Sequence, residues 1–227
     1  MQFLEWSILG LRSARHVLRN EERDLSITLF PMVHLAEPEF YERVNSDAAK
    51  HDVVVLEGIN SPVSRRLTRT YRWSRPARLG LVIQKKFSCE GVRTVLADLP
   101  SVEFETLWRS GPRWERAVIE CGAAIFGLRL RLVGTRASLG KKFNTTDLPD
   151  RDEVMMWTER NAPLLDALRT ARDASLCRAV TDLLAESEQV HSVAIIYGAR
   201  HMGVLVHVLR KAGFRPVASE WMQVFSA

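Results

Sequence analysis

Four short runs of consecutive apolar residues, many of them β-branched, recur along the chain. They are LSITLFPMVH (25–34), DVVVLEG (52–58), VRTVLADL (92–99) and SVAIIYG (192–198). A strand buried on both faces has this composition, whereas a strand with one solvent-facing side alternates apolar and polar residues. We therefore predict four strands in the core of a largely parallel sheet.

Segments with apolar residues at helical spacing separate these runs. They cover residues 37–51, a helix that opens at Ser101, most of 153–186, and 201–213. Alternating strands and helices predict an α/β fold, with a mostly parallel central sheet flanked by helices. A large helical insert, over about 101–187, is expected between the third and fourth strands. The last segment, 214–225, is predicted to be an edge strand, because Pro216 cannot donate a hydrogen bond to a neighbour.

Length and composition fit one globular domain over residues 1–227. The three cysteines are far apart and suggest no disulfide framework, so we expect a reducing, cytoplasmic location. The first residues lack the features of a signal peptide. Residues 117–134 are apolar but include Glu120, Arg129 and Arg131, which predicts a buried helix and no membrane span.

The segment 61–88 is strongly basic. There is no acidic residue between Glu57 and Glu90. The basic residues there are Arg65, Arg66, Arg69, Arg72, Arg75, Arg78, Lys85 and Lys86. One interpretation is a patch for an anionic surface or nucleic acid; the other is a solvated insertion whose arginine stems cover apolar atoms. We favour the second and expect no nucleic-acid partner, because no nucleic-acid motif accompanies the charge.

Polar side chains follow the predicted parallel strands at the points where each strand ends. His34 follows the first strand, Glu57 ends the second, Asp98 ends the third, and His201 follows the fourth. Ligands of open α/β sheets bind at the carboxyl ends of the strands. We therefore expect these four residues to lie along one rim of the sheet.

Two imidazoles and a carboxylate are the smallest protein set for a catalytic divalent metal with an open position. His34 and His201 would be ligands, and Glu57 either a third ligand or the general base. Nitrogen and oxygen donors together admit Zn, Mn, Co or Fe. The alternative is that each of these residues caps a helix or satisfies a loop.

The C-terminal stretch IIYGARHMGVLVHVLRKAGF resembles the second Gly-x-x-His motif of the TraB/PrgY/GumN family, which includes the Tiki proteins. Gly198, His201 and Gly203 fall on that motif. The first motif of the family resembles LFPMVHLAEPEFY, with His34 in register and Pro31 where glycine is usual. The strands that end in Glu57 and Asp98 match in order, and TERNAPLLDAL places Arg160 and Asn161 on an Arg–Asn pair of the family.

The resemblance implies an α/β core and a metal-dependent hydrolase of the metalloprotease or esterase-like kind. It implies that Arg160 stabilises the oxyanion of a tetrahedral intermediate, with Asn161 beside it. Asp98 would take the catalytic role that Glu57 leaves open, or would support a ligand. The substrate would be a peptide or a small molecule, and the oligomeric state stays open, a dimer included.

Two other functions compete with a hydrolase. Pro31 in place of glycine motivates a binding or regulatory protein that keeps the fold without catalysis. The basic stretch from Arg65 to Lys86 motivates a protein that binds an anionic surface or nucleic acid.

Overall fold

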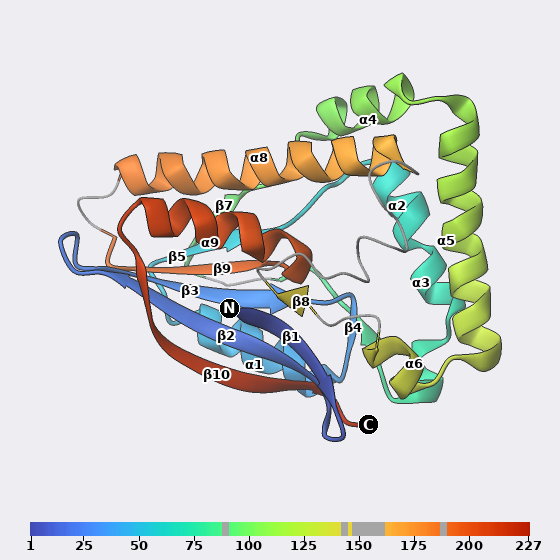
Figure 1. Ribbon diagram of the computed structural model, residues 1–227, viewed down its shortest axis with the longest axis horizontal. Helices are drawn as coiled ribbons and strands as arrows, with labels where there is room; N and C mark the ends of the chain where they lie inside the picture. Colours follow the sequence, from blue (N-terminus) through green and yellow to red (C-terminus); the bar gives the residue numbers. More distant parts are fainter. Residues whose placement is uncertain (88–90, 142–144, 147–161, 187–189) are drawn as a thin grey trace.

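An eight-stranded mixed sheet lies at the centre of the computed structural model (Figure 1). The structure describes residues 1–87, 91–141, 145–146, 162–186 and 190–227. Helices flank the sheet, so the predicted α/β class is confirmed. The strand order is β7-β5-β9-β3-β2-β1-β8, and β10 pairs with β2 outside this path.

Four of the strands run parallel and form one half of the sheet. They are β3 (Leu25–Met32), β5 (Val53–Leu56), β7 (Arg93–Leu96) and β9 (Ser192–Gly198). β9 lies between β3 and β5, and its central residues are fully buried, as the apolar run predicts. β7 is at the margin instead: it pairs with β5, and most of its side chains are exposed.

The other half of the sheet is antiparallel and comes mainly from the N-terminal segment, for which the sequence pattern predicts no element. Its strands are β1 (Gln2–Ser7), β2 (Gly10–Asn20), β8 (Thr145–Thr146) and β10 (Arg215–Phe225). β10 pairs with β2 along almost its whole length. The expected C-terminal strand is therefore confirmed, and among the described strands it pairs with β2 alone.

Two crossover helices cover opposite faces of the parallel half. α1 (Pro38–Ala48) connects β3 to β5, and α8 (Pro163–Glu186) precedes β9. Right-handed crossovers that proceed in opposite directions along a sheet place their helices on opposite faces. α9 (Met202–Lys211) packs beside α8 (Figure 1), and Gly213, with a φ of 89°, ends it in the left-handed conformation that favours glycine.

The basic segment forms short helices at the side of the sheet. It contains α2 (Pro62–Thr68), α3 (Thr70–Trp73), the 3₁₀ helix η1 (Pro76–Leu79) and β6 (Val82–Ile83). β6 pairs with β4 (Leu35–Ala36), which lies just after His34. The basic segment is therefore anchored next to the end of β3.

The segment between β7 and α8 holds α4 (Ser101–Ser110), α5 (Arg113–Val133), α6 (Arg136–Gly140) and β8. α5 stands at the outer edge of the molecule, beyond α2 and α3 (Figure 1). The helix predicted over residues 117–134 is confirmed by α5, but the prediction that it is buried is wrong, because Ile125, Leu128 and Leu132 are more than half exposed. None of the described helices is long and apolar enough to cross a membrane.

Candidate functional site

The carboxyl ends of the parallel strands carry the residues from which the site is built. Glu57 directly follows β5, Asp98 lies two residues after β7, and Gly198 ends β9. His201 ends the 3₁₀ helix η2 (Ala199–His201) that follows β9, and His34 lies between β3 and β4. The strands run parallel, so these positions belong to the same edge of the sheet.

Arg172, on α8, joins the carboxylates of two strands. Its Nε donates to Asp98 Oδ1 at 3.0 Å and its Nη2 to Asp98 Oδ2 at 2.9 Å. Nη2 also donates to Glu57 Oε1. One guanidinium therefore fixes both acids, and the Asp98 side chain is 1 % exposed. This geometry shows directly that the ends of β5 and β7 meet.

The second oxygen of Glu57 is held from the neighbouring strand. The Gly198 N–H donates to Glu57 Oε2 at 2.5 Å. A Cβ atom on Gly198 would lie 3.1 Å from that oxygen and 3.5 Å from His201 Cδ2. A side chain at position 198 would therefore crowd the Glu57 carboxylate, which lies close to the end of β9.

His201 is buried and is oriented by an acid that the sequence did not reveal. Its Nδ1 donates to Asp173 Oδ1 at 2.5 Å. A carboxylate accepts only, so Nδ1 carries the proton and Nε2 bears the lone pair when the ring is neutral. Tyr197 packs edge-on against the same ring, with 5.1 Å between centroids. Asp173 and Tyr197 thus fix both the tautomer and the plane of the imidazole.

His34, at the end of β3, lies near the cluster of charged side chains formed by Glu57, Asp98, Arg172, Asp173 and His201. Its ring lies 5.1 Å from that of Tyr71 on α3, and its carbonyl accepts from the Gln84 N–H at 2.9 Å. Although the side chain is exposed to solvent, desolvation by the surrounding protein lowers the pKa of its imidazole. Arg172 lowers it too, while Glu57 and the Gln84 side chain oppose the change. His34 is therefore neutral at neutral pH.

The charges of the cluster stabilise one another. Burial on its own would raise the pKa of Glu57, but Arg172, His201 and His34 together outweigh burial, so this pKa is lowered. Burial would likewise lower the pKa of Arg172, yet Asp98 and Glu57 raise it. Glu57 is therefore ionised and Arg172 protonated across the physiological range.

Pro31 does not disturb the strand that carries His34. β3 extends to Met32, and the last residue of β3 that pairs with β2 is Leu29. The missing N–H of Pro31 therefore leaves that ladder intact, and its carbonyl accepts from the Ser13 hydroxyl at 2.7 Å.

Arg172 and Asp173 are the members of the cluster that the sequence analysis missed. A signal for Arg172 exists: the buried residues Leu164, Leu168, Leu176 and Val180 are spaced by four, and position 172 is the gap in that series. A cation within an apolar stripe needs a buried partner. Asp173 gives no comparable signal.

Three other residues were singled out in the sequence. Gly203 lies in the first turn of α9. Arg160 and Asn161 lie outside the described residues, so the oxyanion role of Arg160 stays a prediction.

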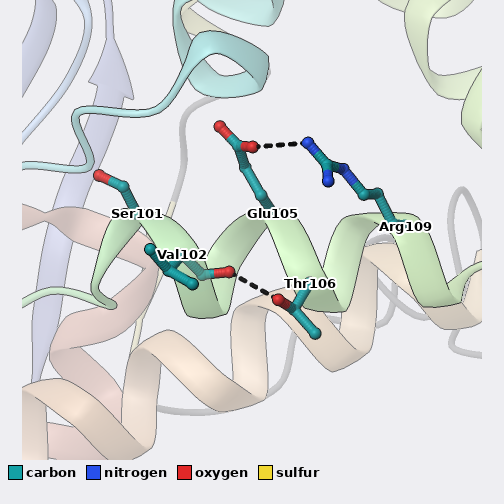
Figure 2. Close-up of a pocket in the computed structure, with 5 residues that line it drawn as sticks. All are labelled: Ser101, Val102, Glu105, Thr106 and Arg109. Carbon is teal, nitrogen blue, oxygen red and sulfur yellow. Dashed lines mark hydrogen bonds and ion pairs between the residues drawn. The ribbon is translucent and has the colours of Figure 1, made fainter.

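A hollow of about 160 Å³ on α4 is separate from this cluster. It is lined by Ser101, Val102, Glu105, Thr106 and Arg109 (Figure 2). Glu105 pairs with Arg109, and the Thr106 hydroxyl donates to the Val102 carbonyl. These polar groups satisfy one another along one helix face, and we assign no site to the hollow.

Comparison of the chain with protein-family models, with curated proteins and with solved structures gives no match. The likeness to the TraB/PrgY/GumN family therefore rests on the motifs in the sequence alone.

Stability should fall as the pH decreases from about 7.5 to 5.5, and His34→Gln should make this dependence shallower. A histidine whose folded pKa is lowered binds its proton more readily in the unfolded chain, so acid favours unfolding below the unfolded pKa of about 6.5. Urea denaturation of chelator-treated protein at several pH values measures the slope. His191→Gln, at an exposed histidine, is the control and should keep the wild-type slope; an unchanged slope in His34→Gln would contradict the assignment.

Proposed function

We propose that the chain is a hydrolase of amides or esters that uses a divalent metal at the carboxyl edge of the sheet. The observation that carries the proposal is the pairing of His201 with Asp173 beside the ionised carboxylate of Glu57. Peptides or small molecules are the substrate class. His34 and His201 would hold the metal, with Glu57 as a third ligand or as the base.

The donor atoms suit a divalent metal in two respects: their chemical type, and the orientation and protonation state in which the protein holds them. Metal-binding histidines usually donate their second N–H to a carboxylate, which fixes the tautomer and raises ligand basicity. His201 and Asp173 have this arrangement. His34 is kept neutral and Glu57 ionised, the protonation states that ligands need. Among the described residues, no three His, Cys, Asp or Glu side chains already form a group that could hold a metal, so the fit rests on donor type and common location.

The chain contributes orientation and proton transfer to the reaction. A bound divalent metal would supply Lewis acidity and lower the pKa of water. Glu57, whose two oxygens are both held by hydrogen bonds, would accept a proton from the attacking water and return it to the leaving group. Arg172 donates to both acids and holds them in place, so we assign it a positioning role, shared with Asp173 at His201.

A binding protein without catalysis is the second candidate. The observation in its favour is that both oxygens of Glu57 already accept hydrogen bonds, from Arg172 and from Gly198. A purely structural ion-pair cluster has the same appearance. In that case the protein binds a partner without a metal, and Glu57→Gln leaves binding intact.

Protein purified without a polyhistidine tag should bind one divalent ion per chain, and His201→Ala should lose it. Asp173→Asn should weaken metal affinity by about 10- to 100-fold, because it removes the group that orients His201. Elemental analysis and competition with a chelating dye measure both effects.

His207→Ala is the matched control, since His207 is an exposed histidine on α9. Circular dichroism should show all the variants folded. Equal metal content in wild type and His201→Ala would reject the ligand assignment. Metal binding without turnover on peptide and ester panels would favour the second candidate.

A further inference from the structure

An apolar stripe runs the length of α5 and faces away from the protein. Its members recur at alternating spacings of four and three residues, the seam of an amphipathic helix. They are Trp114, Val118, Cys121, Ile125, Leu128 and Leu132. Trp114 is 63 % exposed, Ile125 65 % and Leu132 64 %. Exposed apolar surface of this extent marks an interaction site.

The opposite face of α5 is firmly attached, so the stripe is held outward by the fold. Gly127 lies under α3, where a Cβ atom would come within 2.6 Å of the Thr70 carbonyl oxygen. Phe126 packs edge-on against Tyr71 at 6.2 Å. Ile119 and Leu130 are buried. A rotation of α5 that hid the stripe would break all of these contacts.

Exposed arginines lie on α5 and on the helices that pack against it. Arg113, Arg129 and Arg131 are exposed on α5 itself. Arg65 on α2, Arg72 on α3 and Arg69 between these two helices, which lie alongside α5, are also exposed.

The acids of α5 do not offset this charge. Glu115 is buried and accepts from the Leu164 N–H at 2.7 Å. Glu120 is paired with Arg66 at 2.6 Å. The surface around the stripe therefore carries an excess of positive charge.

The positive charge around the stripe indicates which kind of partner fits this surface. A second copy packed stripe to stripe would bring Arg129 and Arg131 against arginines of the other chain, in either helix orientation. A nucleic acid would match the arginines but would leave Ile125 and Leu128 against phosphate and water. The surface of an anionic lipid bilayer matches both features, since it buries the apolar side chains at the level of the headgroups and pairs the arginines with them.

We propose that α5, together with the arginines of α2 and α3, is a docking surface for anionic lipid bilayers, with the α5 axis in the plane of the interface. Trp114 on α5 and the half-exposed Trp73 on α3 are of the type that concentrates at this depth. This surface contains none of the residues assigned to the proposed metal, so the inference stands apart from the proposed hydrolase.

Co-sedimentation of the full chain with vesicles tests the proposal. Vesicles with about one third phosphatidylserine should bind the protein, and pure phosphatidylcholine vesicles should bind it at least tenfold more weakly, because each arginine near an anionic surface contributes about fivefold in affinity. The double variant Ile125→Glu, Leu128→Glu should lose binding. Arg129→Glu, Arg131→Glu should lose at least tenfold and should reduce the salt dependence.

Val217→Glu is the control: it adds one glutamate at an exposed apolar residue of β10, away from α5, and should bind as the wild type does. The arginine pair keeps the test decisive if the Ile125 and Leu128 variant fails to fold. Wild type that does not sediment with anionic vesicles would overturn the proposal. So would a dimer in analytical ultracentrifugation that the Ile125 and Leu128 variant abolishes, or binding to nucleic acid without binding to vesicles.

Discussion

Replacement of Arg172 by methionine should lower the free energy of unfolding by about 3 to 5 kcal/mol at pH 7. Methionine replaces the aliphatic part of the side chain but leaves Glu57 and Asp98 largely buried and without their common cation. The loss of one partner of a buried pair has a cost of this order. The deficit should shrink toward pH 4, where protons neutralise the stranded carboxylates. Urea denaturation at pH 7 and pH 4 measures both quantities.

Arg178→Met is the matched control, because Arg178 is on the same helix and is exposed. It should stay within about 0.5 kcal/mol of wild type. A similarly small change in Arg172→Met would mean that Arg172 does not hold the two strand ends together.

Ile195→Ala should cost roughly 4 kcal/mol. Ile195 is fully buried in β9, in register with Leu29 of β3 on one side and Val55 of β5 on the other. Truncation there leaves a cavity that the flanking strands cannot close without losing their pairing. Thermal and urea denaturation should show a lower midpoint with an unchanged m-value.

Val217→Ala removes apolar atoms from an exposed position of β10 and should change stability by less than about 0.5 kcal/mol. If Ile195→Ala behaved in the same way, β9 would not occupy the centre of the sheet.

The parallel half of the fold could be predicted because each of its strands is a run of apolar residues with a polar residue shortly after its carboxyl end. That rule is also what led to Glu57 and Asp98, and Arg172 shows that the two lie together. The same rule cannot identify Arg172 and Asp173, because these residues lie in the middle of helix α8 and not at the end of a strand. For Arg172 the interrupted apolar stripe was a usable signal.

The N-terminal strands could not be predicted from the pattern of apolar and polar residues. β2 contains Arg12 and Arg15, which break the alternation of apolar and polar residues, and both are only partly exposed. They are tolerated because Arg12 pairs with Glu5, and Arg15 with Asp47 and Glu220. These partners come from separate elements, so tertiary structure decides what the local sequence does not.

The exposed face of α5 was missed for a related reason. Hydropathy indicates that a helix such as 113–133 has an apolar side, but it does not indicate which side the protein covers. The contacts of Gly127 and Phe126 with α3 determine which side of α5 the protein covers.

The position of β9 bears on how the chain can be synthesised. β9 begins at Ser192, yet it pairs with both β3 and β5, whose residues leave the ribosome well over a hundred residues earlier. Until β9 emerges, the described strands of the parallel half have open inner edges, of the kind that recruits other chains. The same strand ends in Gly198, beside Glu57. A nascent chain therefore closes its sheet and completes its site in one late event, and truncation before residue 192 would remove both.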